Sequence, residues 1–175
     1  MAISSMTPPG VLDRLSARLI LLWAGFSIGV AFLATPVKFL APSLTLPVAL
    51  DVGRHTFSIY NQAELALLAV LILLSVRSPL WRRRYVALSV PGVIVAAQAI
   101  WLIPALDARV STILAGQAPP ASSLHAVYIA AELAKVLWLL AFGFGDLLPA
   151  RRGTRRHAGA ALRGPTSRHI REGGL

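Results

Sequence analysis

The sequence predicts an all-α fold, an integral membrane bundle of four helices, and two observations lead to this prediction. Apolar residues make up 56% of the chain and the mean hydropathy is +0.68, more than a soluble domain of 175 residues is able to bury. These residues also gather in four runs, each close to the ~20 residues that cross ~30 Å of hydrocarbon. The chain is short enough for the four runs to form one domain.

The first run, about residues 15–35, is expected to be a retained membrane anchor, preceded by residues 1–14 as an N-terminal segment. It is longer than the apolar region of a typical secretory signal, and we find no Ala-x-Ala cleavage site after it. Gly25 and Gly29 within it have small-xxx-small spacing, which predicts close packing against a neighbouring helix inside the bundle.

The other three runs complete a predicted transmembrane domain over residues 15–148. They cover about residues 57–76, 85–104 and 126–145. The transmembrane domain is predicted to end and the tail to begin near residue 149, because apolar residues give way to arginines there.

Cap and turn signals predict that the helices are longer than the apolar runs. Thr45 followed by Pro47 indicates that the second helix begins about ten residues before its run. Gly116, followed by two prolines, is expected to end an extended third helix. Ser122 or Ser123 is positioned to cap the fourth. One end of the bundle is therefore expected to project beyond the membrane.

The distribution of basic residues predicts the orientation, because Lys and Arg near helix ends resist translocation. The link between the first and second runs and the link between the third and fourth runs hold only Lys38, Arg54 and Arg109, and Lys135 lies within the fourth run. Thirteen basic residues lie in the N-terminal region, the turn between the second and third runs, and the tail: Arg14, Arg18, Arg77, Arg82, Arg83, Arg84, Arg151, Arg152, Arg155, Arg156, Arg163, Arg168 and Arg171. We therefore expect both termini in the cytoplasm. The Arg- and Ala-rich composition favours a bacterial inner membrane.

The tail, residues 149–175, is rich in Arg and Gly and poor in apolar residues, so it is expected to be disordered. Its charge predicts attraction to anionic lipids at ~1 kcal/mol per basic residue near the surface. A nucleic-acid partner is not expected despite the net charge of +10, because the tail offers neither a folded platform nor interleaved aromatic residues. The predicted partner is the lipid bilayer, and the oligomeric state is open.

An internal repeat is visible in the second and fourth runs. Residues 60–66 and 128–134 both read Tyr-x-x-Ala-Glu-Leu-Ala, at an offset of 68 residues. The same offset relates Pro36 to Pro104, near the ends of the first and third runs. These matches predict two duplicated helical hairpins related by an axis along the membrane normal, as in some transporters.

Four polar residues are predicted to form a layer inside the membrane. Glu64, Gln98 and Glu132 lie at one depth, roughly 10 Å below the outer boundary, and Lys135 lies about one turn deeper. Intramembrane charges cost several kcal/mol each and normally face the interior of a bundle, where they mark a binding or transport site by default. We therefore take these four residues as the candidate binding site.

The charges of this layer do not balance, since two carboxylates share one ammonium. A net negative charge in a poor dielectric is costly. Three ways to compensate it remain open: one Glu is protonated, a cation or basic group of a substrate binds, or Arg54 or Arg109 reaches down from outside. The functional prediction is a site that handles protons, cations or a small solute; the alternative is a membrane scaffold in which the layer fixes helix register.

Enzyme chemistry is not predicted, and no cofactor or metal is expected. The chain has no cysteine, nucleophile elbow, phosphate loop or metal-ligand spacing. His55 and His125 lie near the outer boundary, where exposed histidines are a simpler interpretation than haem or metal ligands. Tyr60 and Tyr128 are expected either in the interfacial aromatic belt or as hydrogen-bond partners of the Glu one turn on. These four residues are possible outer-face contributors to the site.

A further set of features resembles a known group. The sequence has a Gly-rich first helix that ends at 34–36, a basic turn at 81–84, an outer acidic-basic pair at 107–109, and a His125 ahead of Glu132. In these features residues 15–144 resemble the small bacterial membrane proteins of the transmembrane-protein-205-like group. The resemblance implies a four-helix integral membrane fold and assigns no catalytic residue.

Overall fold

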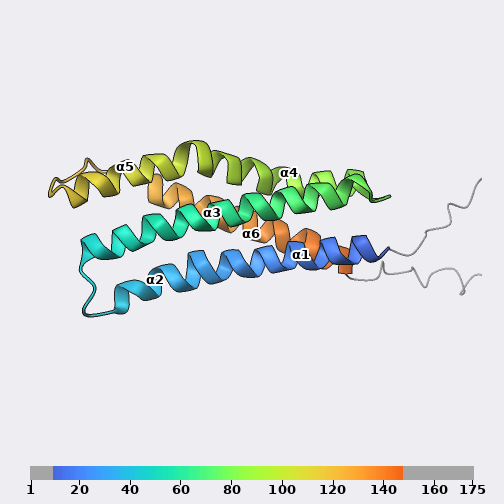
Figure 1. Ribbon diagram of the computed structural model, residues 1–175, viewed down its shortest axis with the longest axis horizontal. Helices are drawn as coiled ribbons and strands as arrows, with labels where there is room; N and C mark the ends of the chain where they lie inside the picture. The colour runs from blue at the N-terminus through green and yellow to red at the C-terminus, as the bar shows by residue number, and fades with distance from the viewer. Residues whose placement is uncertain (1–9, 148–175) are drawn as a thin grey trace, which may run out of the picture.

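The computed structural model describes residues 10–147, and throughout this range the fold is an all-α bundle of four long helices (Figure 1). The predicted fold class is therefore confirmed. Both ends of the described chain and the turn at 77–80 lie at one end of the bundle, called the terminal end here. The links 41–45 and 115–123 lie at the opposite end, called the loop end.

The four helices are longer than the apolar runs within them. Two of the four are interrupted by π-helical turns, so that they consist of several labelled elements. The first comprises α1 (Val11–Ser27), the π-helix Ile28–Ala34, α2 (Thr35–Val37) and the 3₁₀ turn Lys38–Leu40; the second is α3 (Leu46–Val76); the third comprises α4 (Trp81–Ala97), the π-helix Gln98–Leu102 and α5 (Ile103–Leu114); the fourth is α6 (Leu124–Leu147).

The helices hold 30, 31, 34 and 24 residues. At ~1.5 Å per residue, each is longer than the ~30 Å hydrocarbon core. Large apolar side chains cover the outside of the bundle, among them Leu22, Ile59, Leu73, Val93 and Leu137. All four helices are long and apolar enough to cross a membrane. The chain is therefore a multi-pass membrane protein.

The predicted cap signals agree with the helix ends. Helix α3 begins at Leu46, directly after Thr45, although the Thr45 hydroxyl forms no capping bond. Helix α5 ends at Leu114, and Gly116 follows with a positive φ of 77°, a conformation that glycine adopts without strain. At the start of α6, the backbone N–H of Leu124 donates to Ser122 Oγ over 3.2 Å. Tertiary packing did not override these local signals.

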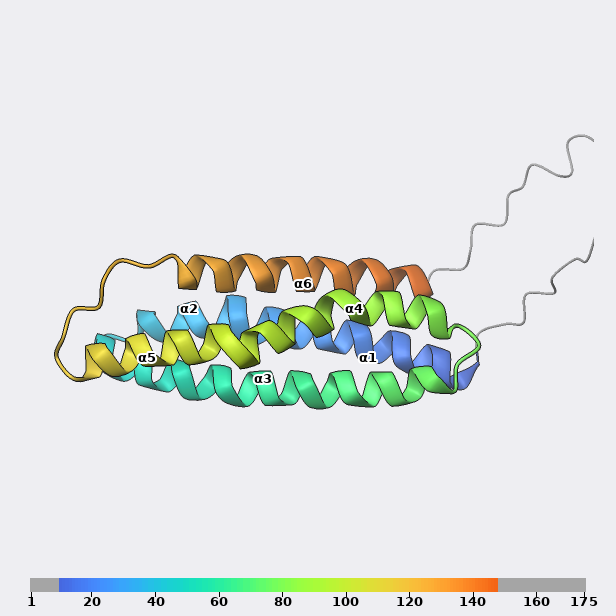
Figure 2. The ribbon, with the colours of Figure 1, turned by 90° about the horizontal axis from the view of Figure 1, so that it is seen from above.

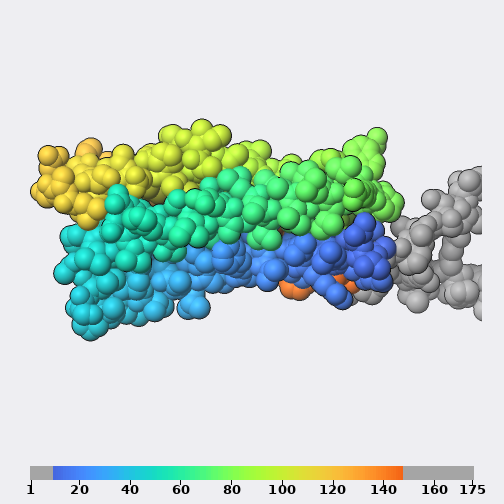
Figure 3. Space-filling model, in the orientation of Figure 1, coloured from blue at the N-terminus to red at the C-terminus, as the bar shows by residue number. Residues whose placement is uncertain are grey.

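The helices occupy the corners of a square, which two perpendicular views show. Helix α3 and helix α6 lie at opposite corners, as do α1 and α4 (Figures 1 and 2). The most extensive packing joins α1 to α6 and α3 to α4, and smaller contacts join α1 to α3 and α4 to α6. The space-filling view shows α3 between the first and third helices on one side of the bundle (Figure 3).

The two π-helices coincide with the repeat in the sequence. Pro36 and Pro104 each come two residues after a π-helix ends, at Ala34 and Leu102. Proline lacks an N–H and its ring clashes with the carbonyl four residues earlier, so a local widening of the helix relieves both problems. Ala34 and Leu102 are separated by the same 68 residues as the two prolines. This supports the predicted hairpin duplication, which stays a prediction.

One expectation about glycine is wrong. A Cβ added at Gly25 or Gly29 would meet nothing within 4 Å, so these residues do not pack closely inside the bundle. The close approach is instead at Gly143 of α6, where an added Cβ would come 3.3 Å from the Ile20 side chain and closer still to Leu21. Spacing alone does not say which face of α1 turns inward. Larger side chains, among them Trp23, occupy the inward face instead of Gly25 and Gly29.

The inward face of α1 is occupied by larger side chains that form the apolar core. Ile20, Trp23 and Ala24 pack there with Leu71 of α3 and Leu139 of α6. In a bilayer the alternative to this packing is lipid rather than water, so van der Waals contact between these side chains holds the helices together. Most of this cluster lies in the terminal half of the bundle.

A buried ion-pair cluster, called the terminal clamp, closes the terminal end. It consists of Asp13, Ser78, Arg84 and Asp146. The Arg84 guanidinium donates to Asp146 Oδ2 over 2.5 Å and to the backbone carbonyl of Asp13 over 2.7 Å. Ser78 Oγ donates to Asp13 Oδ1 over 2.5 Å. Because these residues come from α1, the turn after α3, α4 and α6, the clamp joins all four helices.

We predict that Arg84→Met lowers the free energy of unfolding by ~3 kcal/mol or more, because it leaves the buried Asp146 carboxylate without its main partner. Arg83 also pairs with Asp146, at 2.7 Å, but its side chain is 49% exposed against 2% for Arg84. Arg83→Met is the matched control and should cost less than ~1 kcal/mol. Equal losses in a detergent unfolding titration would contradict the clamp.

Candidate functional site

The four polar residues predicted to share a layer do meet in the centre of the bundle. Glu64, Gln98, Glu132 and Lys135 are each at most 1% exposed. The structure adds three further side chains to them, Trp23, Ser27 and Tyr60, all buried. These seven residues are called the polar layer below. Every helix contributes at least one of them.

Lys135 lies at the centre of the polar layer. Its Nζ is 2.5 Å from Glu64 Oε1 and 2.6 Å from Glu132 Oε1, so one ammonium bridges two carboxylates. The same Nζ is 3.4 Å from Tyr60 OH and from Gln98 Oε1. Lys135 and Glu132 are three residues apart on α6, whereas Glu64 belongs to α3. The ammonium therefore links the two halves of the sequence repeat.

The two carboxylates differ in how completely they are hydrogen bonded. Both oxygens of Glu132 have partners: Gln98 Nε2 donates to Oε1 over 2.7 Å, and Tyr60 OH donates to Oε2 over 3.0 Å. Glu64 Oε1 accepts from Trp23 Nε1 over 2.8 Å and from Ser27 Oγ over 3.4 Å. Its Oε2 is buried without a partner among the described residues. The donors thus reach both oxygens of Glu132 but only one oxygen of Glu64.

Both π-helices begin at the depth of the polar layer. Gln98 is the first residue of one, and Ser27 directly precedes the other. Widened turns shift the hydrogen-bond register, and side chains bond the affected carbonyls: Asn61 Nδ2 donates to the Val95 carbonyl over 3.3 Å, and Thr35 Oγ1 to that of Val30 over 2.8 Å. π-Helical turns in α-helices are frequent at functional sites.

The proposed compensation by an outer arginine is wrong. Arg54 Nε lies 2.7 Å from Asp51 Oδ1, and its Nη1 lies 3.5 Å from Asp107 Oδ1. Arg109 donates to the Pro120 carbonyl over 2.7 Å. Both arginines are held at the loop end by local partners. The polar layer therefore contains two carboxyl groups and a single ammonium.

The repeated tyrosines have different partners, although both are only 2% exposed and so do not belong to an interfacial belt. Tyr60 bonds Glu132 of the other hairpin rather than Glu64 one turn on. Tyr128 packs edge-on against Phe57, with ring centroids 4.8 Å apart, and its hydroxyl has no partner within residues 10–147. The sequence alone did not distinguish these two roles.

His55 and His125 are both exposed, as expected. His55 Nδ1 lies 2.9 Å from the carbonyl of Asp51, one turn earlier on α3. Within residues 10–147 no group of three or more His, Asp or Glu side chains is placed to hold a metal ion. His125 faces a cavity rather than the polar layer.

A cavity, called the loop-end cavity, lies between the helices on the loop-end side of the polar layer. It consists of two adjoining spaces of about 260 and 340 Å³, whose walls share Thr35, Phe39, Phe57, His125 and Tyr128. The second space extends down to Glu132. Glu132 is itself 0% exposed, so the cavity reaches the wall of the polar layer without exposing its charges.

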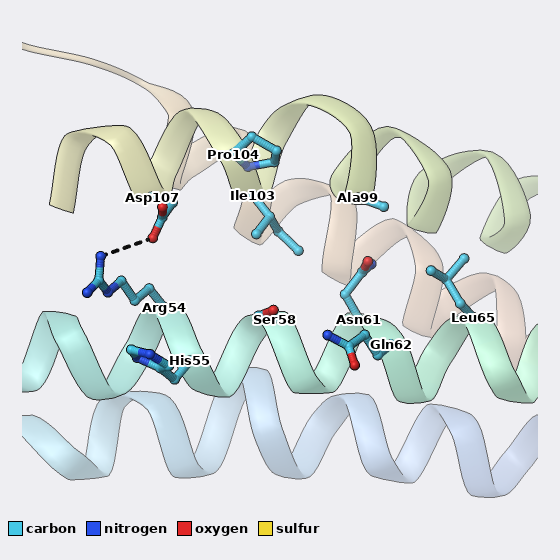
Figure 4. A pocket seen from close by; sticks show the side chains of 10 residues that line it. All are labelled: Arg54, His55, Ser58, Asn61, Gln62, Leu65, Ala99, Ile103, Pro104 and Asp107. Atoms are coloured by element: carbon cyan, nitrogen blue, oxygen red, sulfur yellow. Dashed lines mark ion pairs between the residues drawn. The ribbon is translucent and has the colours of Figure 1, made fainter. Parts of the chain in front are cut away.

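A separate groove of about 720 Å³ runs along the side of the bundle, between α3 and the third helix (Figure 4). Its wall on α3 is polar: His55, Ser58 and Gln62 follow one another at helical spacing and are exposed. The ion pair of Arg54 with Asp107, dashed at the left of Figure 4, crosses the groove on its loop-end side. Both residues also line the loop-end cavity, so this ion pair separates the two spaces.

Sequence reasoning missed Trp23, Ser27 and the terminal clamp. Trp23 and Ser27 are four residues apart and so share one face of α1, but nothing in the sequence points that face at Glu64. In the clamp, Arg84 is one of three consecutive arginines, and only the structure distinguishes it from its neighbours. The predicted tail, residues 149–175, and most of the predicted segment 1–14 lie outside the described residues.

Comparison of the chain with protein-family models, curated proteins and solved structures found no match. The resemblance to the transmembrane-protein-205-like group therefore stays a prediction. The geometry of the polar layer is therefore the observation from which a function can be inferred.

We predict an asymmetry among variants of the polar layer, measured as the free energy of unfolding in mixed micelles at neutral pH. Lys135→Met leaves two buried carboxyl groups with no cation and should cost ~3–5 kcal/mol. Glu64→Gln or Glu132→Gln leaves one carboxylate with one ammonium, and each should change stability by less than ~1 kcal/mol. If both Gln variants are as damaging as Lys135→Met, the layer is a structural network of ionised groups.

Proposed function

We propose that this multi-pass membrane protein is a proton-coupled carrier whose polar layer binds and releases one proton. The observation that supports this is the charge count: Glu64 and Glu132 share the single ammonium of Lys135 in a layer whose residues are at most 2% exposed. An unbalanced buried charge is costly, and a proton removes it. The layer is neutral when it holds that proton and negative when it has released it.

Glu64 is the proposed proton carrier. Glu132 accepts hydrogen bonds at both oxygens, which stabilises its ionised form, whereas Glu64 Oε2 is buried without a partner among the described residues. The groups that face Glu64 from the packed helices are Trp23 and Ser27 on α1, Tyr60 on α3, and Glu132 and Lys135 on α6. A hard metal ion is a poorer candidate, since it needs six or more oxygen ligands and Lys135 already takes one oxygen of each Glu.

The loop-end cavity supports access to the layer from one side. It extends to the wall formed by Glu132, and Tyr128, whose hydroxyl has no partner among the residues that the structure describes, lies on this wall one turn from Glu132. Apolar packing and the terminal clamp close the other side. In a carrier, this arrangement corresponds to a conformation open towards the loop end, and opening of the clamp would expose the other side.

A scaffold without transport is the second candidate, and one observation favours it. The polar layer is nearly fully hydrogen bonded and receives side chains from all four helices, so it fixes the register of each helix against the others. A scaffold needs no exchange of protons with water. The two candidates therefore differ in the protonation of the layer and not in its geometry.

We predict that the number of protonated carboxyl groups in the layer follows the charge balance. Infrared spectroscopy at neutral pH should detect one protonated carboxyl in the wild type, none in Glu64→Gln or Glu132→Gln, and two in Lys135→Met. Asp107→Asn, at the loop end, is the control and should leave the signal unchanged. A wild type with both Glu ionised and no bound cation would contradict the proposal, and the Gln variants test it even if Lys135→Met does not fold.

The proposed orientation places the terminal end in the cytoplasm, in the inner membrane of a bacterium. The support is the distribution of thirteen basic residues to this end and the tail, against three in the outer links. The Arg-rich tail, residues 149–175, is proposed to contact anionic lipids on the same side.

Single cysteines test this orientation, because the natural chain has none. We predict that Gln117→Cys, in the link 115–123, reacts with a membrane-impermeant maleimide on intact spheroplasts. Arg82→Cys, an exposed residue at the terminal end, should react only after the membrane is opened. The reverse pattern of labelling would place the terminal end outside.

A further inference from the structure

The walls of the loop-end cavity are mostly apolar. Its larger apolar side chains are Phe39, Leu50, Phe57, Leu106, Val110 and Ile113. Along α6 the walls run from His125 to Glu132, a rise of ~10 Å. The two spaces, about 260 and 340 Å³, lie just below and just above the lower limit of the ~300–1,000 Å³ typical of ligand pockets. The cavity is therefore shaped for a small, elongated apolar group.

The loop-end part of these walls is positively charged. Lys38, Arg54 and Arg109 line it together with one carboxylate, Asp107. Arg54 is neutralised by its ion pairs with Asp51 and Asp107. Lys38 and Arg109 form no ion pair within the part of the chain that the structure describes. Because Asp51 and Asp107 both pair with Arg54, the three cations and two carboxylates leave one net positive charge beside an apolar cavity.

The position of the Lys38 ammonium depends on Gly53. Gly53 is buried on α3, and a Cβ at this residue would overlap Lys38 Nζ. Nζ also lies 5.2 Å from the centroid of the Phe39 ring. The Lys38 side chain therefore lies against α3 on the cavity wall, and a Cβ at residue 53 would shift its flexible end.

From this geometry we infer that the loop-end cavity binds a single-chain anionic amphiphile. Its anionic group pairs with Lys38, with Arg109 nearby, and its chain lies between the apolar walls and points towards Tyr128. A charge-assisted hydrogen bond and a sequestered chain are the two contributions to the affinity. A neutral or cationic amphiphile lacks the first contribution.

This inference deepens the proposed function by naming the solute class. As a statement about transport it rests on the proton-coupled carrier, since one proton carried with one monoanion makes the transported charge zero. As a statement about binding it depends only on the cavity. A polar layer that does not titrate would remove the transport role and leave the binding site.

Octanoate is the probe, and the protein is used as the full chain in nanodiscs of phosphatidylcholine at a pH where the acid is ionised. Binding of tritiated octanoate is measured by scintillation proximity. We predict saturable binding that unlabelled octanoate displaces, whereas octanol and octyltrimethylammonium displace it at least about tenfold less well. Equal displacement by octanol would show a purely apolar cavity and overturn the inference.

Two variants test the anion site. Lys38→Met keeps the apolar stem and removes the charge, and it should weaken octanoate binding about tenfold or more while octanol binding is unchanged. Gly53→Ala keeps the charge but displaces the ammonium, and it should weaken binding in the same direction. Arg77→Met removes an exposed charge at the terminal end and should have no effect. Wild-type octanoate affinity in Lys38→Met would overturn the inference even if Gly53→Ala does not fold.

The anionic amphiphile has two possible sources, the water phase or the lipid bilayer, and nanodiscs of a second composition distinguish them. If the site takes an amphiphile from the bilayer, added single-chain lysophosphatidylglycerol should reduce the octanoate affinity of the wild type and leave the residual binding of Lys38→Met unchanged. If lysophosphatidylglycerol has no effect, the site takes the free acid. Either result upholds the anion site, and an equal reduction in both proteins would show surface charge rather than a site.

Discussion

The ammonium of Lys135, held 2.5 Å from one carboxylate and 2.6 Å from another, is the contact to which the other features of the bundle interior are fitted. It joins Glu64 on the second helix to Glu132 on the fourth, and the remaining donors of the layer serve these two carboxylates. In a bilayer no water compensates a misplaced charge, so the four helices are constrained to the register in which this contact forms.

The two halves of the bundle differ because of this layer. On the terminal side, the core around Trp23 and Leu139 and the clamp at Arg84 leave the helices tightly joined. On the loop side, both π-helices and their prolines widen the first and third helices, and the loop-end cavity lies between them. A closed half and an open half on either side of a charged layer are the arrangement that a carrier requires in one of its conformations.

The layer also shows why an intramembrane network is not by itself evidence of stability. A buried ion pair recovers at best part of the desolvation that it costs, and here one carboxyl group is in excess. Apolar side chains of similar volume would avoid this cost. Tyr128, whose hydroxyl has no partner within residues 10–147, lines the cavity together with Glu132, so the path from the layer to water is shortest on this side.

The sequence by itself determined the four apolar helices, their ends at Thr45 and Gly116, and the common depth of Glu64, Gln98 and Glu132. Length, cap chemistry and the 1.5 Å rise are local properties, so no neighbour is needed to deduce them. Tertiary structure alone decided which helix faces meet. The rotation of each helix about its axis follows from packing, and it selected Trp23 over Gly25 as the inward face, gave Tyr60 a partner in the other hairpin, and held the outer arginines away from the layer.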